Sequence, residues 1–108
     1  MVTRLTIPTR LVLEVLLADA DVELYGLEIA EASGLPSGTL HPILARLEGQ
    51  GWATSRWEEI DPSAVGRPAR RYYRLTATGR REAAHRLAKA RPLPRLGGVA
   101  VEPGGASS

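Results

Sequence analysis

One stretch of this 108-residue chain, residues 37–51, constrains the fold more than any other. Its apolar residues recur at intervals of three and four, the spacing that places side chains on one buried face of an α-helix. These residues are Leu40, Ile43, Leu44 and Leu47. Ser37 is a suitable N-cap, because its hydroxyl can accept a hydrogen bond from a backbone N–H of the first turn. Gly49 and Gly51 end the segment, and we predict one amphipathic helix between these limits.

The opposite face of this helix carries small, hydrogen-bonding and cationic side chains. They are Thr39, His41, Ala45 and Arg46. Such a mixture suits the base edges of a DNA major groove, and the helix N-terminus adds an attraction for phosphate. Two plainer interpretations stay open: Ser37 is only a cap, and Arg46 pairs with Glu48 or Glu58 instead of reaching phosphate.

Pro42 falls inside the predicted helix. An interior proline costs about 3 kcal/mol, because it lacks the N–H donor and its ring crowds the carbonyl one turn earlier. That carbonyl belongs to Gly38, the most adaptable residue available. We therefore expect an irregular first turn rather than a broken helix.

Two helices are predicted before this one. Residues 9–20 form a helix that is apolar on most sides, so we expect it to be buried against its own core and against a second copy of the chain. A shorter helix, residues 27–33, follows Tyr25 and ends at Gly34, which tolerates a left-handed C-terminal conformation. Two helices joined by a glycine-containing turn have the spacing of a helix-turn-helix unit.

After the third helix, the pattern changes to that of two antiparallel strands, residues 52–59 and 70–76. The connecting loop, residues 61–69, is too long for a tight hairpin, and the two strands with their loop make a wing. Tyr73 and Leu75 should share one face of the second strand. The aromatic side chains of the strands are expected to pack in the core; they are Trp52, Trp57, Tyr72 and Tyr73.

The wing also holds a cluster of arginines at positions 67, 70 and 71. Arginine in a wing can enter a narrow minor groove or clamp backbone phosphates. Because Arg70 and Arg71 are adjacent, one of them must point away from the DNA. The candidate DNA-contacting residues are Ser37, Gly38, Thr39, His41, Arg46, Arg67, Arg70 and Arg71, and only one of the last two can face the DNA.

A last helix, about residues 79–91, can be capped by Thr76 or Thr78, and its apolar side chains are mostly small. We expect residues 1–91 to form one domain that includes this helix as a short dimerisation element. Residues 92–108 are rich in Gly, Pro, Ser and Ala, which predicts a disordered tail.

Composition excludes several other classes of protein. The chain has no cysteine and two distant histidines, His41 and His85, so we expect neither a disulfide framework nor a metal site, and no cofactor. Glu58 and Glu59 are adjacent on a strand and point to opposite faces, so they make a poor catalytic pair, and we expect no enzyme. No signal peptide or spanning segment is recognisable, so we expect a cytoplasmic protein.

Charge is distributed unevenly along the chain. Residues 1–66 hold four arginines against ten acidic residues, whereas residues 67–108 hold ten basic residues against two acidic ones. The basic half is an electrostatic footprint suited to phosphates. A solvated basic surface without a partner is the alternative interpretation.

Three segments occur in an order that is more specific than a helix-turn-helix pattern alone. They are residues 24–29 (LYGLEI), 37–51 (SGTLHPILARLEGQG) and 66–79 (GRPARRYYRLTATG). Together they resemble the PadR family of bacterial transcriptional regulators over about Leu11–Arg91. The resemblance implies that a proline at position 42 is habitual. This chain differs in carrying His41 where the family often has tyrosine, and in its short last helix without aromatic residues.

The resemblance implies a mainly α fold with a small two-stranded β-wing, a winged helix-turn-helix with a C-terminal helix. It further implies a homodimeric repressor that binds double-stranded DNA at a pseudo-palindromic operator. We expect such a repressor on the nucleoid in the cytoplasm, with a small aromatic effector that relieves repression. Two alternatives stay open: a winged-helix protein-interaction module without DNA binding, and a dimer whose cleft binds a small molecule.

Overall fold

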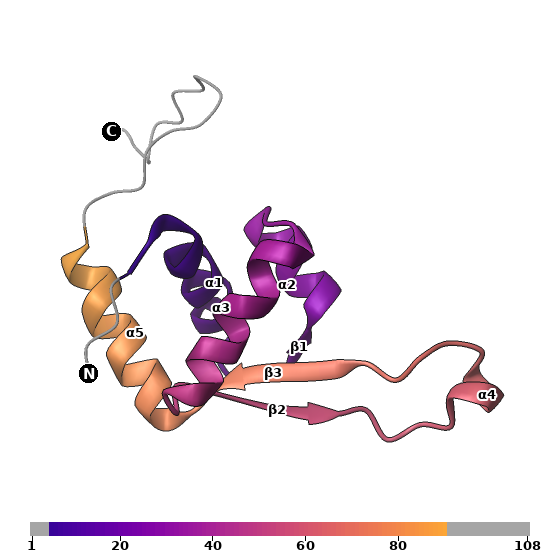
Figure 1. Ribbon diagram of the computed structural model, residues 1–108. Coiled ribbons are helices and arrows are strands. Elements are labelled where there is room, and N and C mark those ends of the chain that lie inside the picture. Colours follow the sequence, from indigo (N-terminus) through magenta and orange to yellow (C-terminus); the bar gives the residue numbers. More distant parts are fainter. Residues whose placement is uncertain (1–4, 91–108) are drawn as a thin grey trace, which may run out of the picture.

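The computed structural model describes residues 5–90, and helices dominate this part of the chain (Figure 1). Its elements, in chain order, are α1 (Ile7–Ala18), β1 (Leu24–Tyr25), α2 (Gly26–Ser33), α3 (Ser37–Gly49), β2 (Ala53–Trp57), α4 (Pro62–Val65), β3 (Arg71–Leu75) and α5 (Ala77–Lys89). The predicted tail, residues 92–108, and the last residue of the predicted domain lie outside the described residues. No helix within residues 5–90 has both the length and the apolar character needed to cross a membrane.

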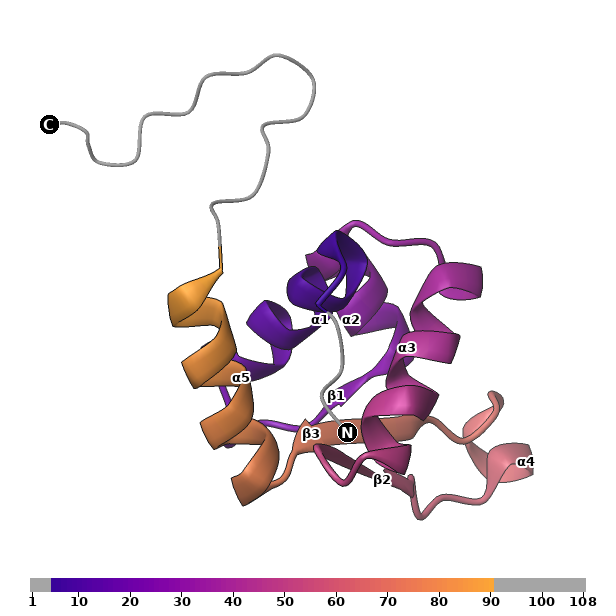
Figure 2. The same cartoon turned by 60° about the vertical axis from the view of Figure 1, so that its left-hand side comes forward.

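The helices α1, α2 and α3 pack together on one side of the small sheet (Figure 1). The hairpin of β2 and β3 projects away from them and carries α4 at its far end. In both views α1 lies between α5 and α3 (Figure 2). This arrangement confirms the predicted fold, which is mainly helical with a wing and a C-terminal helix.

The sheet is antiparallel and has the strand order β1-β3-β2. The sequence predicted only the two wing strands; β1 joins the free edge of β3, with Tyr25 opposite Tyr72. A strand of two residues is too short to show the alternation by which strands are recognised, so this element could not be seen in the pattern. The wing loop also differs from the prediction, which had no regular structure there: it contains the short helix α4.

One continuous core joins α1, α2, α3, the sheet and α5. It consists of Val12, Leu13, Leu16, Ile29, Leu40, Ile43, Leu44, Leu47, Trp52, Ala53, Tyr73, Leu75 and Ala83. All four apolar residues predicted for the buried face of α3 belong to it, which confirms that prediction. Core packing is also confirmed for Trp52 and Tyr73 but is wrong for Trp57, which is 59% exposed.

The start of α3 differs from the prediction in one respect. Ser37 is not the N-cap: Pro36 takes that position with an extended backbone, and Ser37 is the first helical residue, with no side-chain capping bond. The Pro36 carbonyl accepts from the N–H groups of both Thr39 and Leu40, each at 3.0 Å, which tightens the first turn. The helix continues unbroken through Pro42, as expected.

The start of α5 is hydrogen-bonded to the segment that follows α3. Thr76 is the N-cap of α5, and its hydroxyl accepts from the Gly79 N–H at 3.0 Å. The backbone N–H of Thr76 donates to the Trp52 carbonyl at 2.9 Å. Gly79 is buried against the same carbonyl, and a Cβ at position 79 would overlap its oxygen. Glycine is therefore required where α5 crosses the backbone of residue 52.

Candidate nucleic-acid interface

The outer face of α3 presents the polar residues that the sequence singled out in this helix. Thr39 is half-buried, and the other four are exposed: Ser37, Gly38, His41 and Arg46. Because Leu40, Leu44 and Leu47 hold the opposite face in the core, the helix cannot rotate to hide them. The result is a rigidly supported strip of small and hydrogen-bonding groups with one cation.

Arg46 makes no ion pair with any residue in the described part of the chain. The two carboxylates considered as its partners are engaged elsewhere. Glu48 accepts a hydrogen bond from the Ser55 hydroxyl at 2.5 Å, and Glu58 pairs with Arg67. The guanidinium of Arg46 is thus available to an external anion.

The turn between α2 and α3 has the geometry expected of a helix-turn-helix. Gly34 ends α2 with a left-handed φ of 77°, and its N–H donates to the Ala30 carbonyl at 2.9 Å. At the other end of α2, the His41 ring lies close to Gly26, with Cε1 3.6 Å from the position that a Cβ on residue 26 would take. The side chain of His41 therefore lies between the start of α2 and the exposed strip of α3.

The three wing arginines have three different environments. Arg67 forms a two-pronged ion pair with Glu58, with Nη1–Oε1 at 2.8 Å and Nη2–Oε2 at 3.0 Å. The Arg70 guanidinium lies over the ring of Tyr25, 4.3 Å from the centroid.

Arg71 lies over the ring of Trp57, 4.9 Å from the centroid, and 4.0 Å from the Glu48 carboxylate of α3. Because Arg70 contacts β1 and Arg71 contacts α3, the two neighbours point to opposite faces of the sheet, as the sequence required. Arg71 therefore faces the side of the sheet on which α3 lies, while Arg70 faces the outer side.

Electrostatics stabilise the ionised form of Glu58. Hydrogen bonds from the Arg67 guanidinium lower the pKa of Glu58 from its ordinary 4.5 to about 2, outweighing partial burial, and the backbone N–H of Arg70 adds to the lowering. The same hydrogen bonds raise the pKa of Arg67. This pair is fully charged at neutral pH.

A second group, on the outer face of the sheet, was not found from the sequence. The rings of Tyr25 and Tyr72 meet edge to face with centroids 5.7 Å apart, and Arg56 lies over Tyr72 at 5.2 Å. Glu23 holds Arg56 through contacts as short as 2.7 Å, and these hydrogen bonds lower the pKa of Glu23. The cross-strand register that aligns these residues was the missing information.

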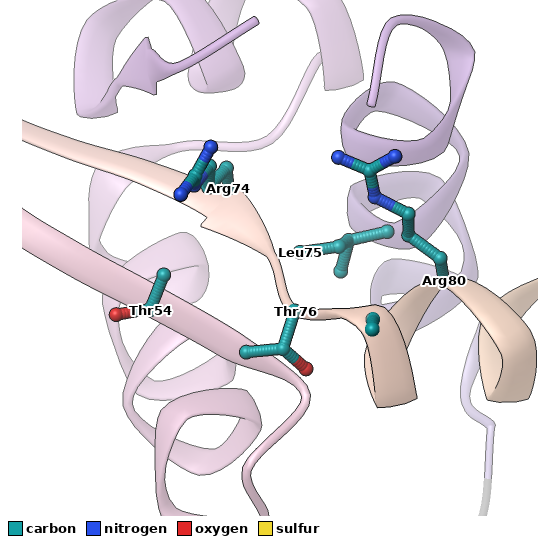
Figure 3. A pocket seen from close by; sticks show the side chains of 6 residues that line it. Thr54, Arg74, Leu75, Thr76 and Arg80 are labelled. Carbon is teal, nitrogen blue, oxygen red and sulfur yellow. The ribbon is translucent and has the colours of Figure 1, made fainter. Parts of the chain in front are cut away.

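Two shallow pockets lie away from the outer strip of α3. The first, about 400 Å³, is lined by Thr54, Arg74, Leu75, Thr76, Ala77 and Arg80. Figure 3 shows Arg74 of β3 and Arg80 of α5 extending to the same side of it. Arg80 is already bound to the carboxylate of Asp21 at 3.0 Å.

The second pocket, about 370 Å³, lies between α1, α2 and β1 and is mainly apolar; its lining is Leu11, Glu14, Val15, Ala18, Leu24, Ala32 and Ser33. Neither of these two pockets has an aromatic side chain in its lining. Within residues 5–90, no three His, Asp or Glu side chains gather closely enough to hold a metal ion.

Several solved structures share this fold. A PadR family transcriptional regulator from Eggerthella lenta DSM 2243 is 30% identical with a TM-score of 0.60, over 77% of this chain and 73% of that chain. A PadR family transcription regulator from Clostridium difficile R20291 is 24% identical with a TM-score of 0.63, over 78% of this chain and 86% of that chain.

Bacillus subtilis PadR, crystallised in complex with operator DNA, is 20% identical with a TM-score of 0.65. The match covers 84% of this chain and 53% of that chain, so the present chain corresponds to about half of that protein. At this level of identity the likeness concerns the fold alone. No curated protein shows a significant match.

The family model described as the transcriptional regulator PadR-like family matches residues 12–85. This range includes α2, α3 and both wing strands, so it spans the elements that carry the exposed strip and the wing arginines. The chain therefore belongs to the PadR-like family of transcriptional regulators, and it is a DNA-binding regulator rather than an enzyme.

Proposed function

We propose that this protein is a homodimeric repressor that binds double-stranded operator DNA with two symmetric half-sites. In this proposal α3 enters the major groove, and its exposed residues Ser37, Gly38, Thr39, His41 and Arg46 meet base edges and nearby phosphates. The observation that carries the proposal is the rigid polar strip on α3, in which the Arg46 guanidinium has no ion-pair partner among the described residues.

The wing supplies the second part of the interface. Arg70 and Arg71 are each held over an aromatic ring, and Arg71 also lies 4.0 Å from the Glu48 carboxylate. Because the two point to opposite faces of the sheet, Arg71, on the side of α3, is the one that suits the backbone or the minor groove beside the site that α3 reads. Arg67, which the sequence placed in the same role, reaches DNA only if it leaves Glu58.

The apolar side chains of α1 support the homodimer. Ile7 is 44% exposed, and Leu11 and Val15 are half-buried beside the apolar pocket. In contrast, α5 buries Ala83 and packs Leu87 against the core, so its free face offers mainly small side chains. We infer that α1 contributes more of the dimer contact than the last helix does.

An effector would act on this dimer by changing the distance between the two copies of α3. A small aromatic effector would need a site formed between the two copies, because neither pocket described above has an aromatic lining. We place the protein in the cytoplasm, on the nucleoid, since operator DNA is its proposed partner.

The test is a footprint on the DNA upstream of the protein's own gene, combined with light scattering of the protein alone and with DNA. A single protected region with two symmetric halves and a dimer in solution is the expected result. Binding should weaken steeply with salt, because phosphate neutralisation releases counterions. Absence of any salt-sensitive, competitor-resistant binding would instead favour a protein-interaction module.

A further inference from the structure

The wing loop, residues 59–69, is closed at its base by Glu58 and Arg70. The Glu58 N–H donates to the Arg70 carbonyl at 2.7 Å, as in a regular antiparallel pair. The return bond is different, because the Arg70 N–H donates to the Glu58 side chain, with N–Oε1 at 3.1 Å. The carboxylate thus takes the place of a backbone carbonyl, and the ladder of β2 and β3 ends there.

The same carboxylate binds Arg67 from within the loop. Both of its oxygens accept from the Arg67 guanidinium, and Arg67 Nη1 also donates to the Pro68 carbonyl at 3.1 Å. The side chains are only partly exposed, 32% for Arg67 and 17% for Glu58. A two-pronged arginine–carboxylate pair of this kind is among the stronger polar contacts in proteins. The Glu58 carboxylate therefore holds the loop through three hydrogen bonds, two from Arg67 and one from Arg70.

We propose that Glu58 is a positioning residue of the DNA interface, which keeps the wing loop closed and holds Arg67 away from phosphate. Arg67 then serves the shape of the wing, while Arg71, on the side of the sheet that faces α3, remains for the DNA. This inference rests on the proposed function, since it assigns roles within the same interface.

The alternative, in which Arg67 leaves Glu58 for a phosphate, is unfavourable for a physical reason. It would leave a partly buried carboxylate without its main partner. The uncompensated charge would also stand beside the DNA phosphates and repel them. The exchange therefore loses an ion pair and adds a like-charge contact for each phosphate contact that it gains.

The experiment compares Glu58→Gln with Glu59→Gln. Both changes remove one negative charge from the wing, but Glu59 is exposed and makes no hydrogen bond or ion pair with the described residues. Affinity for the footprinted operator is measured at several salt concentrations. We expect Glu58→Gln to weaken binding about tenfold and Glu59→Gln to leave it unchanged or tighten it. Equal tightening by both would overturn the proposal, because Glu58 would then act through charge alone.

Arg67→Ala and the double variant complete the comparison. We expect Arg67→Ala to weaken DNA binding with an unchanged salt dependence. The double variant should bind DNA at least as tightly as the weaker-binding of the two single variants, because both changes break the same ion pair. A phosphate contact by Arg67 would instead lower the slope of log K against log salt by about 0.9. That result would contradict the assignment of Arg67 to the wing scaffold.

Amide hydrogen exchange of the free protein gives a readout that needs no DNA. The Arg70 amide should exchange faster in Glu58→Ala, which has no oxygen to accept from it, than in the native protein, whereas the Arg74 amide, inside the paired strands, should be unchanged. Unchanged exchange at Arg70 would overturn the loop-closing role. If exchange at Arg70 is faster in the variant but the native protein binds no DNA, the loop-closing role of Glu58 holds and the proposed DNA-binding function is wrong.

Discussion

Glu48, in the last turn of α3, accepts a hydrogen bond from the hydroxyl of Ser55 in β2, with Oε2 and Oγ 2.5 Å apart. The same carboxylate lies 4.0 Å from the Arg71 guanidinium of β3. One side chain of α3 therefore contacts both strands of the wing. This contact ties the position of α3 to that of the wing, the two elements that the proposed function brings to DNA.

Ser55→Ala should loosen the contact between α3 and the wing. We expect a loss of about 1 kcal/mol in the free energy of unfolding, the typical net value of one partly buried hydrogen bond. Urea denaturation followed by circular dichroism measures it. Thr54→Ala is the control, because the Thr54 side chain is exposed on the opposite face of β2 and its hydroxyl makes no hydrogen bond within residues 5–90. Equal losses in both variants would show that the Glu48–Ser55 bond contributes nothing specific.

Gly79→Ala should destabilise the fold by about 1–3 kcal/mol, the usual cost of forcing extra atoms into a packed site. Its Cβ would overlap the Trp52 carbonyl oxygen, which is held in place by Thr76. Gly49→Ala is the matched control: this glycine is also helical, nothing lies within 4 Å of its Cβ position, and alanine is the better helix former. Thermal unfolding should show a lower Tm for the first variant and an equal or higher Tm for the second.

Arg46→Ala should weaken operator binding by about tenfold and lower the salt slope by about 0.9, the values for one lost phosphate contact. Arg81→Ala removes the same charge from an exposed position on α5 and should have a much smaller effect. Fluorescence anisotropy with labelled operator at several salt concentrations measures both quantities. Equal effects of the two variants would mean that only net charge matters, and that Arg46 makes no particular contact.

The Glu58 carboxylate should give the protein an acid-dependent loss of stability. Its pKa is lowered on folding, from 4.5 to about 2, so the folded state binds this proton more weakly than the unfolded state does. The stabilisation is therefore fully present above pH 4.5 and is lost as the pH falls toward 2. Urea denaturation across this range should show native stability converging on that of Glu58→Gln. A constant difference between the two proteins would contradict the lowered pKa.

The helices α1, α2, α3 and α5 and the exposed strip of α3 followed from local sequence. The apolar spacing from Leu40 to Leu47 determines which face is buried, and this spacing depends only on helix geometry. The left-handed turn at Gly34 is equally local. The shared face of Tyr73 and Leu75 in β3 was predicted in the same way, because alternate residues of a strand point to the same side, and both are buried.

What sequence could not supply was the partner of each wing arginine. Arg67 lies nine positions from Glu58, and their meeting depends on the register of β2 against β3. Arg70 and Tyr25 are farther apart still, and meet only because β1 joins the edge of β3. Pairings across strands are set by the packing of the whole sheet, so no local pattern specifies them.

The exposure of Trp57 depends on tertiary structure and not on its local sequence. By itself the sequence predicted a strand over residues 52–59 with its tryptophans packed in the core, and the structure has this strand at Ala53–Trp57. Only the tertiary structure decided how far one face of the strand is covered: Ala53 is buried, Ser55 is half-buried and Trp57 is exposed along the same side. Burial decreases toward the tip of the wing because the helices pack over only one end of the hairpin. The strand therefore continues beyond the hydrophobic core.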